Sequence, residues 1–302
     1  MSSSAEAIPG TEPVSAAVVD SLPALREELD TLDDRILDLL TERAQVVKRV
    51  AATKMGAGPL RPGREAAILR RLLGRPHGPL PTPAVIRIWR EIFASSIAQQ
   101  HNVQVAVCDP AMDGRFQAAA REHLGALTPM RIYRSPSQAI GEVVDGRASV
   151  AILPLPGEGA GDGSNSPGWW PGLLQQNTKG RIHVVARLPF WNVRPEGAPS
   201  VQALIVANTP ADPSGEDISL LAVEMESQVS LGSLSNAVTG AGFRPLSILV
   251  NRPAGAPVAQ LLFEVEGFVT PDDPRLAKIA GLQSPALIVG AYAVAIAEEF
   301  AA

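Results

Sequence analysis

An apolar repeat near the start of the chain most constrains its fold. Apolar residues recur there in alternating steps of three and four, with one position missing: Leu22, Leu25, Leu29, Leu32, Ile36, Leu39, Val46 and Val50. Such a heptad repeat is typical of a helix that packs its apolar stripe against other helices. It predicts one helix about 45 Å long. Ser21 is its expected N-cap, and Gly56, Gly58 and Pro59 are expected to end it.

Two further helices are predicted before residue 101. One begins near Arg64 and runs to Leu73, and the other spans about Thr82–Gln100. Three helices, one of them so long, leave part of the apolar stripe uncovered, so a partner chain is expected to cover it. Residues 1–20 carry no basic or apolar signal segment and are predicted to form a disordered tail.

Polar side chains interrupt the apolar faces of this predicted helical region. Arg43 stands where the repeat predicts an apolar residue, and Lys54, eleven residues later, projects from the same face to within about 20°. On the third helix the stripe that includes Phe93 continues with Ser96 and Gln100. An Arg, a Lys, a Ser and a Gln are therefore expected to converge inside a helical bundle.

Two interpretations of these buried cations remain open from spacing alone. Unpaired burial costs several kcal/mol, so the cations need anionic partners. The partner is either a protein carboxylate, Glu42 or Glu65, or a small dianionic ligand. Residues 21–100 contain 13 Lys and Arg against 9 Asp and Glu, which fits either an anionic ligand or ordinary surface scatter. Arg26 faces elsewhere on the first helix, either as a solvated charge or toward a partner subunit's pocket.

The rest of the chain has two more compositional regions. Residues 102–212 read as an α/β unit with a helix at Phe116–Leu124. Its expected strands are Val103–Cys108, Val150–Leu153, Ile182–Ala186 and Ala203–Ala207. Residues 213–302 follow the order βαββαβ of a ferredoxin-like unit. Its expected elements are strands Ile218–Met225, Pro245–Val250, Val258–Val265 and Leu287–Ala293, with helices Leu231–Ala241 and Pro274–Ile279.

Three sequence segments carry a family resemblance. The run LREELDTLDDRILDLLTERAQVVKRVAATK, then PGREAAILRRL and then REIFASSIAQQ, resembles the all-helical chorismate mutases. The resemblance covers residues 22–100 and implies a helical domain at 21–101. It also implies an intertwined homodimer in which two protomers interlock through the first helix, and conversion of chorismate to prephenate without a cofactor.

The resemblance assigns roles to seven residues. Arg26 would be donated to the partner's site, Arg43 would bind a chorismate carboxylate, and Arg64 would lie beside the site. Lys54 would reach the ether oxygen and a carboxylate, and Gln100 would donate to the ether oxygen. Glu65 would accept the ring hydroxyl, and Ser96 would line the pocket. Arg61 departs from the family, which usually has an acidic residue there. If Arg61 filled the pocket or paired with Glu65, the site could be closed and the protein regulatory.

The downstream regions have fainter resemblances. VAVCDPAMDGRFQAAAREHLG resembles the opening of prephenate dehydratase, but the chain contains no Thr-Arg-Phe motif. Residues 102–212 are therefore interpreted as a truncated, inactive dehydratase-like region. Residues 213–302 resemble an ACT regulatory domain, although the Glu of its Glu-Ser-Arg-Pro motif is missing before Arg252-Pro253. A bifunctional mutase and dehydratase remains an alternative.

Other classes of function are disfavoured. The four histidines show no paired spacing and no neighbouring cysteine, so no metal site is expected. The Arg70-Arg71-Arg75 cluster lacks interleaved aromatic residues and the whole chain is acidic, which argues against nucleic-acid binding. No apolar run is long enough for a membrane span. The single cysteine, Cys108, fits a cytoplasmic protein.

Overall fold

The computed structural model describes residues 21–53, 60–157, 168–174, 181–253 and 255–297. The chain divides into two compact units, residues 1–54 and 55–302. Each unit is described by itself below. The predicted domain boundaries at residues 101 and 212 remain predictions. None of the helices in the described ranges is long and apolar enough to cross a membrane.

In the first unit, the described residues form the helix α1, Leu22–Thr53. Ser21 caps it, as predicted: the backbone N–H of Ala24 donates to Ser21 Oγ at 3.4 Å. None of the helix's residues is buried. Every apolar position of the heptad repeat is exposed, with exposed fractions from 40% at Leu25 to 64% at Leu39. The predicted stop signals at Gly56, Gly58 and Pro59 lie outside the described residues.

The second unit begins with the two other helices predicted for the helical region, α2 at Pro62–Leu73 and α3 at Thr82–Ala98. They pack against each other through an apolar cluster that also takes in residues from far along the chain. Its buried members are Ala66, Leu69, Leu73, Val85, Ile86, Phe93, Phe190, Trp191 and Ile296. The α2–α3 pair is therefore fixed to the segments that contain Trp191 and Ile296.

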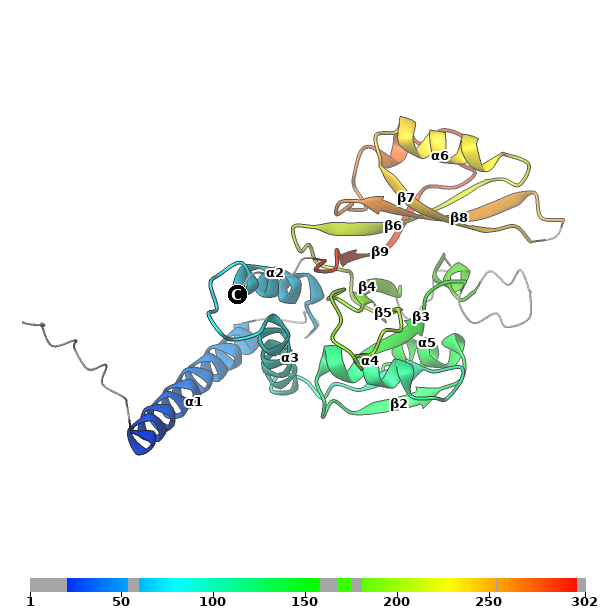
Figure 1. Cartoon of the computed structure of the whole chain (residues 1–302). Helices are drawn as coiled ribbons and strands as arrows, with labels where there is room; N and C mark the ends of the chain where they lie inside the picture. The colour runs from blue at the N-terminus through cyan, green and yellow to red at the C-terminus, as the bar shows by residue number, and fades with distance from the viewer. Residues whose placement is uncertain (1–20, 54–59, 158–167, 175–180, 254, 298–302) are drawn as a thin grey trace, which may run out of the picture. The chain divides into compact units, whose positions relative to one another are not determined.

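Within the described ranges, nine strands form one mixed sheet in the order β2-β1-β3-β5-β4-β9-β6-β8-β7 (Figure 1). The strands are β1 Val105–Cys108, β2 Met130–Tyr133, β3 Val150–Pro154, β4 His183–Leu188, β5 Ala203–Ala207, β6 Asp217–Glu226, β7 Pro245–Asn251, β8 Val258–Glu266 and β9 Leu287–Ala293. Helices α4 Arg115–Leu124 and α5 Pro136–Val144 connect the parallel strands β1, β2 and β3. Strands β5 and β4 continue the sheet as an antiparallel pair.

The C-terminal four strands confirm the predicted βαββαβ order. Helix α6, Leu231–Gly240, follows β6, while the second predicted helix is only the 3₁₀ turn η2, Leu276–Lys278. The four strands lie in the spatial order β9-β6-β8-β7, with antiparallel pairing throughout. This is the ferredoxin-like arrangement that the sequence predicts.

The two halves of the sheet join at a close backbone contact between β4 and β9. Val184 pairs with Gly290. A Cβ on Gly290 would lie only 2.1 Å from the Val184 carbonyl oxygen, so no other residue fits there without moving a strand. Gly290 therefore lets the α/β half and the ferredoxin-like half share one sheet.

One strand and one α-helix escaped sequence prediction, as did the 3₁₀ helix η1, Trp170–Leu174. Strand β2 is a partly exposed edge strand with an alternating polar residue, Arg131, and it shows no continuous apolar run. Helix α5 is short and contains Gly141. Its start did carry a signal, since Ser135 caps the helix by accepting from the Gln138 N–H and Pro136 occupies the first helical position.

Candidate active site

A buried ion pair joins α2 to α3 at a predicted site residue. Arg90 Nη1 donates to Glu65 Oε2 at 3.1 Å, and the two residues are only 5% and 8% exposed. The Arg90 guanidinium also lies over the ring of Phe190, 5.3 Å from its centre. Arg90 therefore fixes the orientation of the Glu65 carboxylate, and the sequence analysis did not identify Arg90 as its partner.

The environment of Glu65 changes its acidity. Burial raises the pKa of its carboxyl from 4.5 to about 7. The Arg90 cation opposes this rise in pKa, while the negative charge of Asp212 adds to it. Glu65 therefore changes charge near neutral pH.

Asp212 binds the first turn of α2, beside the predicted residue Arg64. Its carboxylate accepts from the backbone N–H of Gly63 and from that of Arg64, each at 3.0 Å, and from Arg61 Nε at 3.0 Å. The Arg64 side chain is exposed. Arg61 thus pairs with Asp212, and Glu65 pairs with Arg90. Arg61 and Glu65 therefore do not pair with each other in this way, and an Arg61–Glu65 ion pair does not close the site.

Ser96 and Gln100 lie near the end of α3 and share a hydrogen bond. Gln100 Nε2 donates to the Ser96 carbonyl oxygen at 2.9 Å, and Ser96 Oγ donates to the Ile92 carbonyl oxygen at 2.6 Å. Ser96 is buried and Gln100 half-buried. The second unit thus brings four predicted residues, Arg64, Glu65, Ser96 and Gln100, onto the packed pair α2 and α3.

The remaining predicted cations belong to α1 or follow it. Arg26 is exposed and Arg43 is half-buried. Lys54 lies outside the described residues. Within the described ranges no group of three or more His, Cys, Asp or Glu side chains is arranged to hold a metal ion. The chemistry available on α2 and α3 is therefore that of a carboxylate, an amide, a hydroxyl and guanidinium groups.

Sequence reasoning missed two residues that contact this set. Arg90 did carry a signal, because it interrupts the apolar stripe four residues after Ile86 and three before Phe93. Asp212 carried no such signal, because it contacts Gly63, which lies 149 positions earlier in the sequence. Only the folded chain reveals it.

Comparison with known families places these residues in one domain. Residues 25–101 match the family model "Chorismate mutase type II". These residues form a chorismate mutase type II domain. The domain comprises α1, α2 and α3, and its matched span contains all seven predicted site residues.

The curated relatives are bifunctional proteins. The chain is 35% identical over 144 residues to the bifunctional chorismate mutase/prephenate dehydratase of Stutzerimonas stutzeri, and 34% identical over 144 residues to that of Pseudomonas aeruginosa. In both cases the match covers 45% of this chain and 39% of the relative. The chain thus spans about two fifths of the length of the relatives it matches.

Solved structures give a more distant likeness. GqqA, described as a novel type of quorum quenching acylase, has a TM-score of 0.46 and 18% identity over 64% of this chain and 95% of that one. A prephenate dehydratase from Streptococcus mutans has a TM-score of 0.43 and 14% identity over 63% of this chain and 97% of that one. At these scores neither likeness says anything about activity.

Proposed function

We propose that this protein converts chorismate to prephenate. The observation that carries the proposal is the chorismate mutase type II match over residues 25–101. The matched span includes an Arg, Lys, Glu, Ser and Gln set of the kind that the reaction needs. We place the reaction in the cytoplasm, which the single cysteine favours.

The reaction makes few chemical demands on the protein. Chorismate rearranges by a concerted [3,3] shift that transfers no proton and forms no covalent intermediate with the protein. A catalyst must hold the reactive conformer of the substrate and stabilise the negative charge that grows on the ether oxygen. Fixed cationic and amide donors serve both needs.

The residues divide this work between them. Arg43, together with Arg26 from a partner subunit, binds the two carboxylates of chorismate. Lys54 and Gln100 donate to the ether oxygen, where charge develops in the transition state. Ser96 lines the pocket, and Arg64 adds positive charge beside it.

Glu65 accepts the hydroxyl of the substrate ring. Glu65 Oε2 accepts a hydrogen bond from Arg90 on α3, and this bond fixes the orientation of the Glu65 side chain. The ionised carboxylate is the stronger acceptor, and the pKa of this carboxyl is about 7. The neighbouring Arg90 cation therefore favours the form that binds substrate.

The active unit in this proposal is a homodimer built on α1. Burying one Leu or Ile side chain stabilises a structure by roughly 1.5–3 kcal/mol. The eight apolar side chains of the heptad repeat on α1 are at least 40% exposed, which is typical of a helix that a second copy covers. Residues 102–212 and 213–302 then serve as a dehydratase-like remnant and an ACT-like regulatory domain.

A second candidate function is a bifunctional chorismate mutase and prephenate dehydratase, as the curated relatives are named. One structural observation favours the remnant instead. Strand β4 is followed by residues 189–202 and then by β5 in the same sheet. In the described part of the chain, that connection contains no helix or strand from which a second α/β lobe could be built.

The test is a turnover assay with purified protein. Chorismate absorbance is followed near neutral pH, and the product is tested for phenylpyruvate without an acid step. We expect rapid loss of chorismate with accumulation of prephenate. Phenylpyruvate at neutral pH would establish the bifunctional alternative. No loss of chorismate would refute the proposal and favour a regulatory homologue.

A further inference from the structure

The segment between β5 and β6, residues 208–216, forms hydrogen bonds with the first and the last turn of α2. At the N-terminal end, Asp212 accepts from the backbone N–H groups of Gly63 and Arg64. The helix has no cap from its own sequence: Arg61, at the N-cap position, makes no side-chain capping bond. Asp212 therefore supplies from a distance the acceptor that a helix start usually finds in its own N-cap residue.

The contact at Asp212 is close and enclosed. Its side chain is 12% exposed. A Cβ on Gly63 would lie 2.1 Å from the Asp212 carbonyl oxygen, so the two backbones touch. Asp212 cannot shift without moving the first turn of α2, which carries Arg64 and Glu65.

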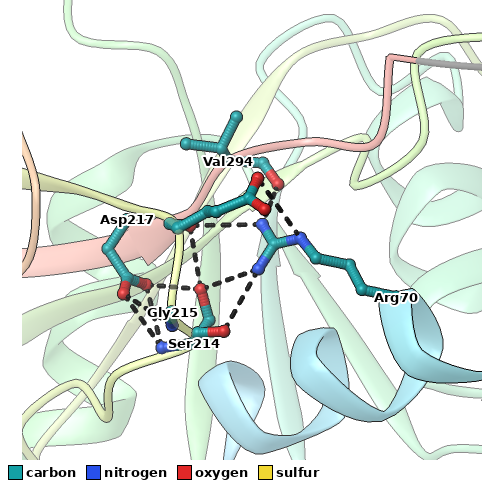
Figure 2. A network of polar contacts seen from close by, with 6 residues as sticks. Arg70, Ser214, Gly215, Asp217 and Val294 are labelled. Carbon is teal, nitrogen blue, oxygen red and sulfur yellow. Dashed lines mark hydrogen bonds and ion pairs between the residues drawn. The ribbon is translucent and has the colours of Figure 1, made fainter.

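A second anchor fixes the same segment further along α2 (Figure 2). Arg70 Nη1 donates to Ser214 Oγ at 3.1 Å, and Arg70 Nη2 donates to the carbonyl oxygens of Glu216 and Val294. The Asp217 carboxylate holds Ser214 in place by accepting from its backbone N–H at 2.9 Å and from its hydroxyl at 2.6 Å. The segment is thus rigidly tied to α2 on one side and to β6 and β9 on the other.

We propose that Asp212 is a positioning residue for the mutase site, holding the first turn of α2 so that Arg64 and Glu65 face the substrate. The inference rests on the proposed function and extends it. The acceptor comes from outside the 25–101 match, so the downstream regions contribute to the geometry of the mutase site.

Asp212 also acts on Glu65 electrostatically. Its negative charge helps to raise the pKa of Glu65, after burial and against the Arg90 cation. Other ionisable groups near Arg90 are Glu122, which pairs with Arg194, and His123, whose pKa is lowered well below its usual value by burial and by the Arg90 cation. Removing the charge at position 212 lowers the pKa of Glu65, an effect that a purely structural role would not produce.

The experiment compares three variants of the full chain with wild type. Asp212→Asn removes the charge and keeps one acceptor oxygen, and Asp212→Ala removes the charge and both acceptors. Glu216→Gln is the matched control, because Glu216 lies on the same segment with a 69% exposed side chain whose carboxylate is 3.8 Å from Arg70 Nε. Circular dichroism and thermal unfolding verify that each variant is folded.

We expect kcat/KM for chorismate to fall by about tenfold in Asp212→Asn and by about a hundredfold in Asp212→Ala, as the loss of positioning predicts. The acidic limb of the pH profile of kcat/KM shifts to lower pH by the same amount in both Asp212 variants. The profile of Glu216→Gln stays like that of wild type. Wild-type kinetics and an unmoved limb in both Asp212 variants would overturn the inference.

A measurement without turnover separates this inference from the proposed function. The carboxyl of Glu65 is titrated by ¹³C NMR in chain labelled at glutamate, with Glu65→Gln assigning the resonance. A lower midpoint in Asp212→Asn supports the inference, and an unchanged midpoint contradicts it. If wild type left chorismate intact, the proposed function would fail, and the positioning role would fail with it, while this titration would still decide whether Asp212 acts on Glu65.

Discussion

Helix α1 and the pair α2 and α3 belong to one matched domain but meet their surroundings in opposite ways. The apolar stripe of α1 is exposed along the whole helix. The apolar faces of α2 and α3 are buried against residues from the segments after β4 and β9, such as Phe190, Trp191 and Ile296. The chain therefore covers one part of its mutase domain with its own downstream residues. The apolar stripe of α1 stays exposed, and the proposed homodimer would cover it.

The two regions also differ in the roles proposed for their charged residues. On α2 and α3, Glu65 is neutralised by Arg90 inside the protein, and the start of α2 is capped by Asp212. On α1 the proposed ligands of the substrate are cations, Arg26 and Arg43. The α2–α3 part is therefore held by contacts within the fold, whereas the role proposed for α1 depends on the proposed homodimer.

The largest effect should come from removing a cation of the α1 part. Arg43→Ala should lower kcat by on the order of 10²–10³-fold, because one preorganised donor to the substrate is lost. Lys54→Ala should behave in the same way. Both are measured by loss of chorismate absorbance with unchanged circular dichroism. Arg35→Ala, an exposed arginine on the same helix, is the control. Near-normal turnover in either site variant would refute the assignment.

The next test addresses the exposed stripe. Ile36→Glu puts a charge on the heptad seam and should convert the dimer to a monomer with little turnover, since a buried unpaired carboxylate costs several kcal/mol. Leu37→Glu is the matched control: Leu37 is 63% exposed and lies one position off the seam. Sedimentation equilibrium measures the mass of both variants. A monomeric wild type, or a dimeric Ile36→Glu, would contradict the role of α1.

Burial on α2 predicts a different kind of loss. Leu69 is fully buried, so Leu69→Ala should lower the free energy of unfolding by about 2–5 kcal/mol without changing oligomeric state. Urea denaturation measures this. Leu127→Ala, at a position that is 93% exposed, should change stability by less than about 0.5 kcal/mol. If both variants lost the same stability, the packing of α2 would have to be revised.

The smallest effect should be a dependence of stability on pH through Glu65. Its pKa is about 7 in the fold against 4.5 ordinarily, so the folded state binds a proton that the unfolded state releases. The resulting stabilisation is fully present below about pH 4.5 and is lost as pH rises through about 7. Urea denaturation between about pH 5 and about pH 8 should show the free energy of unfolding of wild type falling relative to that of Glu65→Gln. Parallel curves would contradict the raised pKa.

Local patterns predicted most of the fold. The heptad repeat located α1, and alternating or continuous apolar runs located every strand except β2. Strand β2 was missed because an edge strand is only partly buried and has no clear apolar pattern. Helix α5 was missed because its short sequence contains Gly141, although its Ser135 cap was visible.

The site was predictable only where its residues follow a local pattern or a family motif. Arg43 and Ser96 interrupt apolar stripes, so their positions could be read from spacing. The Glu65–Arg90 pair required knowing how α2 packs on α3, and Asp212 required a contact spanning 149 positions. Long-range contacts of this kind leave no periodic signal in a single sequence.

Subunit complementation tests the central claim most directly, namely that α1 of one chain completes the site on another. Arg26→Ala and Arg43→Ala chains are assayed separately, then mixed in equal amounts after unfolding and refolded together. If Arg26 is donated across the interface, the separate proteins are inactive and the mixture recovers about a quarter of wild-type turnover, because half of the dimers are mixed and each holds one intact site. A mixture as inactive as its components would contradict a site shared between chains.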